Sequence, residues 1–247
     1  MTEERIGDSF NIELAGVCIG IKPRHERMRD FCKKYISEDS PAFTIEVGES
    51  DIEDEREKGI AYIGRGDIPP FQLEKLFIYR EIAERLPEYD TFLIHAAAIS
   101  VDGEGYLFSG PSGTGKTTHI KLWKKEFKDR MRVINDDKPL IRIGSDEVMA
   151  CGSPWCGKES WSNNISSPLK AVICLHQAKE NRIEEMERTS AWESLMNQIY
   201  RSRDAANMQR TLGFIDYIIS EIPVYSMGCT KDSEAVSVAY EALKGRR

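Results

Sequence analysis

The sequence predicts an α/β protein, more strictly α+β, in which strands and helices alternate along 247 residues. Apolar residues make up 40% of the chain and charged residues 30%, which is typical of a folded globular protein. Short apolar runs of strand length alternate with segments whose apolar residues recur at helical spacing. A glycine-rich loop at residues 110–115 joins one such strand to one such helix, and it marks where function is expected.

The first ninety residues carry the expected N-terminal elements. These are strands over residues 10–21, 42–47 and 60–63 and helices over residues 24–36 and 71–86. A charged run over residues 49–58 indicates an exposed loop or a solvated face between them. We expect residues 1–90 either to complete the sheet of the remaining chain or to fold as a small separate module.

Residues 91–247 form the expected catalytic core. A buried strand over residues 91–100 and a second over 106–109 flank a tight turn at 102–105, which predicts a hairpin. The elements expected after it are a helix over 116–127, strands over 132–135, 140–143, 172–175 and 224–227, and helical segments over 189–220 and 233–244.

Charge and hydropathy exclude several classes of partner. The net charge of -7 disfavours nucleic-acid binding, which needs a basic surface. The longest nearly apolar stretch, residues 91–101, is far shorter than the roughly 18–20 residues of a membrane span. The N-terminal residues are polar and acidic, and six cysteines without a CxxC pair indicate reduced thiols. We therefore expect a cytoplasmic protein without membrane or nucleic-acid partners, and we leave a homo-oligomer open.

The motif G-x-x-x-x-G-K-T lies within residues 106–123, between an apolar strand and an amphipathic helix. Its glycines let successive backbone N–H groups point at phosphate oxygens, and the helix adds its positive end. Lys116 is expected to reach the β- and γ-phosphates of ATP, and the Thr117 hydroxyl to bind Mg²⁺. The alternative is a structural turn. The residues expected to bind the nucleotide are Gly110, Ser112, Gly113, Thr114, Gly115, Lys116, Thr117 and Thr118.

Three further side chains are candidates for the chemistry. Asp136 and Asp137 follow a short strand, where one carboxylate can serve Mg²⁺ and the other can accept a proton. Adjacent residues on an extended strand point to opposite sides, so one of them can instead be structural. His95 lies in an apolar strand at the far end of the expected hairpin. It is either a core histidine or a neighbour of the phosphates.

His95, the glycine-rich loop and Asn135-Asp136-Asp137 together resemble HPr kinase/phosphorylase and the ATP-dependent phosphoenolpyruvate carboxykinases, over roughly residues 91–175. The resemblance is strongest to short HPr-kinase-like serine kinases. It implies a P-loop on a mixed, largely antiparallel sheet. It also implies that Asp136 is the base, that Asp137 binds Mg²⁺ and that His95 lies beside the phosphates.

Residues 151–161 have two interpretations. They form either a mobile loop that closes on ATP and brings Lys158 to the transferred phosphoryl group, or a structural turn with Trp155 in the core. The function that we expect is ATP-dependent phosphoryl transfer to a hydroxyl, most simply a serine, of a peptide, protein or small molecule. The alternatives are carboxykinase-like chemistry on a small acid, a non-catalytic nucleotide sensor, and an NTPase coupled to assembly.

Overall fold

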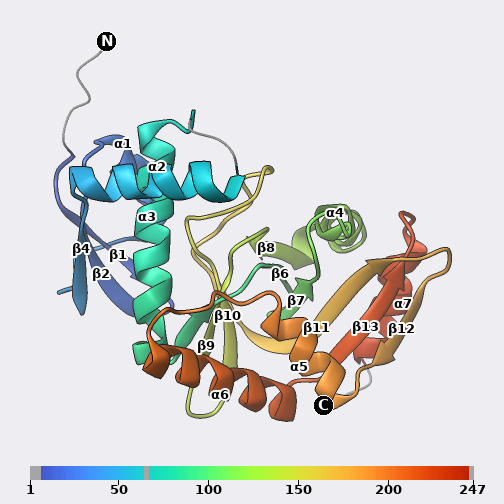
Figure 1. The fold of residues 1–247 in the computed structure, drawn as a ribbon. Helices are drawn as coiled ribbons and strands as arrows, with labels where there is room; N and C mark the ends of the chain where they lie inside the picture. The colour runs from blue at the N-terminus through green and yellow to red at the C-terminus, as the bar shows by residue number, and fades with distance from the viewer. Residues whose placement is uncertain (1–6, 64–66, 245–247) are drawn as a thin grey trace. The chain divides into compact units, whose positions relative to one another are not determined.

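The computed structural model describes residues 7–63 and 67–244, and the chain divides into two compact units, Met1–Arg85 and Leu86–Arg247 (Figure 1). Each unit has a sheet of its own. None of the helices in the described ranges combines the length and the apolar character that a bilayer-spanning helix needs.

The N-terminal unit is a four-stranded sheet in the order β3-β1-β2-β4, together with three α-helices in its described part. Its elements are β1 (Phe10–Leu14), β2 (Val17–Lys22), α1 (Arg27–Phe31), β3 (Ile36–Ser37), β4 (Phe43–Glu46), α2 (Glu49–Ile63) and α3 (Pro70–Arg85). The segment expected to be one strand is a hairpin. Ala15 and Gly16 take positive φ angles of 51° and 80° at its turn.

The loop and the strand expected within residues 49–63 are wrong, because this whole segment is helix α2, whereas the alternative of a solvated face is confirmed for its charged run. The charged run is the polar part of that helix, and the expected strand over residues 60–63 is its last turn, where Ile60 is 52% exposed. The buried carboxylate of Glu55 explains why the run is ordered. It pairs with Lys58 at 2.9 Å and with Arg80 of α3.

The second unit is built on a mixed sheet of nine strands in the described residues, in the order β5-β9-β10-β11-β7-β6-β8, with β13 beside β11 and β12 beside β13. Within the described part of this sheet, only β7–β11 and β11–β13 pair in parallel. The strands are β5 (Thr91–Leu93), β6 (Ala96–Val101), β7 (Glu104–Ser109), β8 (Met131–Asn135), β9 (Leu140–Ile143), β10 (Val148–Cys151), β11 (Ser166–Gln177), β12 (Arg182–Glu185) and β13 (Val224–Cys229). The predominance of antiparallel pairs agrees with the expected fold class.

Helices cover both faces of this sheet (Figure 1). They are α4 (Lys116–Phe127), α5 (Arg188–Met196), α6 (Ala205–Glu221) and α7 (Glu234–Lys244). Alternate residues of β6 serve the two cores, as the pleat of a strand requires. Ala97 and Ile99 lie in the cluster of Trp123 from α4, whereas Ala98 lies in the cluster of Ile215 from α6. The glycine-rich loop directly follows β7, a largely buried strand that lies between β11 and β6 in the sheet.

Several elements of this unit differ from expectation. The strand expected over residues 91–100 is interrupted after Leu93, and the helical segment over 189–220 is divided into α5 and α6. Strands β10 and β12 were not expected. The four residues of β12, Arg182–Glu185, are strongly charged and mostly exposed, so they show no apolar alternation from which a strand could be predicted.

Candidate functional site

The loop between β7 and α4 has three glycines with positive φ angles. Gly110, Gly113 and Gly115 have φ angles of 141°, 85° and 106°, which L-residues rarely adopt. A Cβ on Gly110 would lie 2.8 Å from the carbonyl oxygen of Leu175, so only glycine fits there. A Cβ on Gly113 or Gly115 would meet open space. The loop therefore presents an uncovered backbone in front of the first turn of α4.

Lys116 bends back over this loop. Its ammonium group donates hydrogen bonds to the carbonyl oxygens of Gly110 at 2.6 Å and Pro111 at 3.3 Å, and the residue is only 8% exposed. Burial lowers the pKa of Lys116, the charge of Asp137 acts to raise it and that of Lys138 acts to lower it. The ammonium group is therefore within electrostatic reach of the residues that follow β8.

The register of the β6–β7 hairpin brings His95 to the same place. Asp102 and Gly103 form the two-residue turn with φ angles of 52° and 90°, and Ala96 pairs with Ser109. His95, one residue before Ala96, is therefore level with the first residue of the glycine-rich loop. The glycine-rich loop begins at the far end of this hairpin. The two-residue turn and the register of the pair therefore place His95 level with the start of the loop.

His95 joins a polar cluster and is not enclosed in the core. Its Nε2 lies 3.2 Å from Oδ1 of Asp137, and Oδ2 of Asp137 lies 3.3 Å from Nζ of Lys138. Burial acts to raise the pKa of Asp137, but His95 and Lys138 outweigh it and hold that pKa below its usual value. Gln198 orients the ring, since its Oε1 lies 3.0 Å from Nδ1 and its carbonyl oxygen accepts from the His95 N–H at 2.7 Å.

Asn135 shapes the turn that holds this cluster. Its Oδ1 accepts from the backbone N–H groups of Asp137 at 2.8 Å and Lys138 at 2.6 Å. Its Nδ2 donates to the carbonyl oxygens of Ser153 and Trp155, both at 2.9 Å, and the side chain is fully buried. Sequence reasoning assigned no role to Asn135, although a buried Asn directly before two aspartates is a signal for a side-chain turn.

Asp136 faces away from the cluster. The carboxylate accepts from the backbone N–H of Gly157 at 2.6 Å and of Trp161 at 3.4 Å, and the residue is 5% exposed. Burial raises the pKa of Asp136, although the two N–H groups act to lower it. The adjacent aspartates thus have separate environments, and the Asp136 carboxylate holds the segment over residues 152–163 through these two hydrogen bonds.

The same segment is also attached to α4. Lys121 pairs with Glu159 at 2.8 Å, and the ammonium groups of Lys121 and Lys124 lie 5.7 Å and 5.2 Å from the centre of the Trp161 ring. Trp155 is buried, as the structural interpretation of this segment expects, and Lys158 is exposed beside Glu159. The structure brings His95, Lys116 and Asp137 together, whereas the Asp136 carboxylate is bound by the neighbouring 152–163 segment, to which Lys158 belongs.

Two pockets flank the glycine-rich loop. The first, of about 460 Å³, is lined by Gly113–Gly115, Thr118, Gln177 and Lys231. The second, of about 270 Å³, is lined by Ser109–Pro111 and residues of β11, α5 and β13. Among the described residues, no group of three or more His, Cys, Asp or Glu side chains could hold a metal ion by itself.

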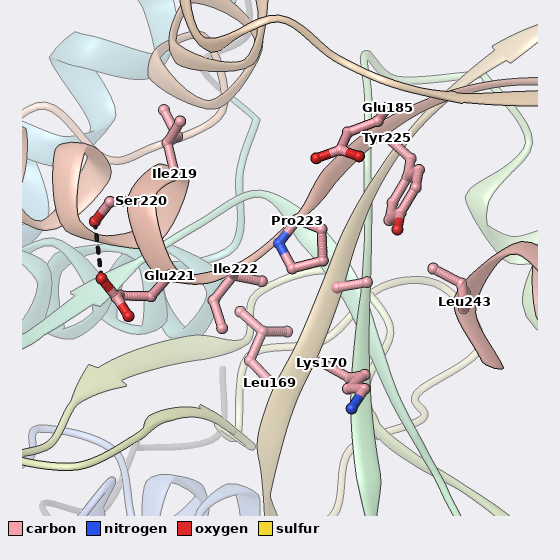
Figure 2. Close-up of a pocket in the computed structure, with 11 residues that line it drawn as sticks. Leu169, Lys170, Glu185, Ile219, Ser220, Glu221, Ile222, Pro223, Tyr225 and Leu243 are labelled. Atoms are coloured by element: carbon pink, nitrogen blue, oxygen red, sulfur yellow. Dashed lines mark hydrogen bonds between the residues drawn. The ribbon is translucent and has the colours of Figure 1, made fainter. Parts of the chain in front are cut away.

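Figure 2 shows a third hollow, of about 380 Å³, whose wall includes Lys170, Pro223 and Tyr225. It lies at the amino-terminal ends of β11 and β13, whereas the glycine-rich loop follows the carboxyl-terminal end of the parallel strand β7. None of the described residues that were expected to form the site lines this hollow. The candidate site is therefore at the other edge of the sheet.

Fold and site together define a mixed-sheet α/β protein with a glycine-rich loop and an acidic turn at one edge. A family model for ScmC, the SynChlorMet cassette protein ScmC, matches residues 72–233, and the chain belongs to this family. A solved structure of the Hpr(Ser) kinase/phosphatase from Coxiella burnetii matches 62% of this chain and 99% of its own, with 11% sequence identity and a TM-score of 0.34. A search of curated proteins finds no match.

Proposed function

We propose that this protein transfers the γ-phosphoryl group of ATP to a hydroxyl group. One observation carries the proposal: a glycine-rich loop whose Gly113 and Gly115 adjoin open space lies next to Lys116 and the His95–Asp137 pair. Phosphoryl transfer needs an anion cradle, a cation beside the phosphates and a carboxylate near the acceptor, and little covalent chemistry from the protein.

The residues of the loop fit a magnesium nucleotide. Gly113 and Gly115 leave the space that phosphate oxygens need, and Lys116 can leave its loop carbonyls for the β- and γ-phosphates. We propose that the Thr117 hydroxyl binds Mg²⁺ directly and that Asp137 holds the ion through a water molecule, since a hard cation prefers oxygen ligands and an ion held through water leaves the carboxylate able to take a proton. Bound there, the ion would neutralise charge on the transferred group. Lys138 and His95 hold the Asp137 carboxylate in place.

We assign the role of catalytic base to Asp137, although the sequence resemblance implies Asp136. Both oxygens of Asp136 accept hydrogen bonds from loop N–H groups, and the carboxylate is buried under Gly157. Asp137 is about one-third exposed and shares the edge with Lys116. We therefore propose that Asp137 receives the acceptor's proton, and that Asp136 and Lys158 act through the position of the 152–163 segment.

Calorimetry with Mg·ATP, followed by measurement of ADP release with and without hydroxyl acceptors, tests the proposal. Lys116→Ala removes the charge that stabilises the transferred group, so we expect a loss of roughly 10²–10³ in rate. Lys125→Ala changes an exposed residue of the same helix and is the matched control, expected to leave the rate unchanged. Binding of Mg·ATP without turnover would favour a nucleotide sensor, and normal turnover in folded Lys116→Ala would contradict the assignment of the loop.

A further inference from the structure

Residues 198–200 lie in the connection between α5 and α6, next to the point where the chain passes from β5 to β6. The N–H of Tyr200 donates to the carbonyl oxygen of Leu93 at 3.0 Å, and Ile199 forms an antiparallel bridge with Ile94. This register sets Gln198 directly opposite His95, whose N–H donates to the Gln198 carbonyl oxygen at 2.7 Å. The connection therefore adds a short antiparallel rung beside the residue that meets Asp137.

The pleat of this rung separates apolar from polar side chains. Ile94 and Ile199 belong to the same buried cluster and are 1% and 8% exposed. Neighbouring residues on extended backbone point to opposite faces, so His95 and Gln198 both leave that cluster on the other side. There Oε1 of Gln198 lies 3.0 Å from Nδ1 of His95. The strand register thus brings the amide to the imidazole.

The two nitrogens of the His95 ring face different partners. Nδ1 faces the Gln198 amide, and Nε2 lies 3.2 Å from Oδ1 of Asp137. A half-turn of the ring about its Cβ–Cγ bond would exchange each nitrogen for a ring carbon, so the hydrogen bond to Gln198 favours one of the two orientations. That orientation is the one in which Nε2 meets the Asp137 carboxylate.

Resting on the proposed function, we infer that Gln198 is a positioning residue for phosphoryl transfer and acts through His95. Its amide keeps the imidazole turned toward the carboxylate to which we assign the acceptor's proton. Without the amide, the ring can turn a carbon toward Asp137. The carboxylate then keeps Lys138 but loses the contact with Nε2. Gln198 itself touches neither the nucleotide nor the acceptor in this role.

The contribution of the side chain can be separated from that of the rung. The backbone hydrogen bonds of residues 198–200 do not depend on which side chain stands at position 198. Gln198→Met has nearly the same length and removes only the amide. The glycine-rich loop and Lys116 are unchanged in this variant. We therefore expect kcat to fall roughly tenfold, the most that one hydrogen bond accounts for, while KM and Kd for Mg·ATP stay the same.

Two further variants distinguish positioning from a general loss of structure. Gln198→Glu keeps an acceptor oxygen at the same reach and should recover most of kcat. Gln209→Met makes the same chemical change at an exposed position of α6 and should leave kcat unchanged. Thermal melts of the three variants check that each is folded. Equal losses of kcat in Gln198→Met and Gln198→Glu, or a raised KM with normal kcat, would overturn the inference.

NMR of the histidine rings tests the positioning of His95 without nucleotide or turnover. The chain has four histidines, and His95→Asn identifies the signals of this ring. We expect the ring signals of His95 to shift in Gln198→Met, to return in Gln198→Glu and to stay in place in Gln209→Met. Unchanged His95 signals in Gln198→Met would overturn the inference. Absence of turnover in the wild-type protein would instead contradict the proposed function, and the ring signals would still decide whether Gln198 fixes His95.

Discussion

Nε2 of His95 lies 3.2 Å from Oδ1 of Asp137, and the backbone N–H of the next residue, Ala96, donates to the Asp137 carbonyl oxygen at 3.2 Å. The antiparallel pairing of β6 with β8 produces both contacts, because it sets the start of one strand against the end of the other. The imidazole and the carboxylate therefore form one structural unit at the edge that carries the glycine-rich loop.

We predict that His95 and Asp137 contribute to turnover together. His95→Asn and Asp137→Asn should each lower the rate of phosphoryl transfer, and the double variant should be little worse than the poorer single variant, with a coupling energy of about 1–3 kcal/mol. Lys125→Ala, at an exposed position of α4, is the control. Additive losses in the rate of ADP release would show that the two groups act separately.

Asp136→Asn should act on stability and not on nucleotide affinity. The carboxylate accepts from Gly157 and Trp161, and the amide can replace only one of its acceptor oxygens. We expect the free energy of unfolding to fall by about 1–3 kcal/mol, with faster proteolysis within residues 152–163. Unchanged stability combined with complete loss of transfer would support Asp136 as the base, as the sequence resemblance implies.

Gly157→Ala probes the contact between the 152–163 segment and Asp136. A Cβ on Gly157 would lie 3.3–3.4 Å from the carboxylate atoms of Asp136, and the buried carboxylate has little freedom to move. We predict a lower melting temperature for this variant. Gly213→Ala is the matched control in helix α6, where a Cβ meets nothing within 4 Å, and it should stabilise by about 0.5–1 kcal/mol. Equal effects of the two substitutions would exclude the proposed contact.

His119 should make the second unit less stable in acid. The ring is buried against Phe108, with a centroid distance of 4.9 Å, and burial lowers its pKa from 6.5 to about 4. Between these values the unfolded chain takes up a proton that the folded chain does not, so stability falls as pH falls, by at most about 1.4 kcal/mol per pH unit.

Urea unfolding, followed by tryptophan fluorescence between about pH 7 and about pH 4.5, measures this dependence. All four tryptophans lie in residues 86–247, so the signal reports on that unit. His119→Leu should lose this part of the pH dependence, and His176→Leu, at an exposed site, should retain it. The same slope in both variants would show that His119 is not the titrating group.

Local features of the chain could be predicted well. The helix over residues 116–127 has the expected bounds, and the hairpin turn lies where the Asp-Gly pair indicates it. Both are decided within a few neighbouring residues, by glycine conformations and by helical spacing. Helix α2 was missed because its charged residues carry no continuous apolar stripe, and the contact of the buried Glu55 with Arg80 of α3 is tertiary.

The sequence by itself thus determined the glycine-rich loop, the strand and helix that flank it and the presence of two aspartates after β8. Tertiary structure alone decided that Asp137 meets His95 while Asp136 meets Gly157, and that Gln198 orients the imidazole. These contacts join residues far apart in the chain through strand register and buried backbone hydrogen bonds. A periodic pattern contains no record of such partners, because it reports which face of an element is buried and not what lies against it.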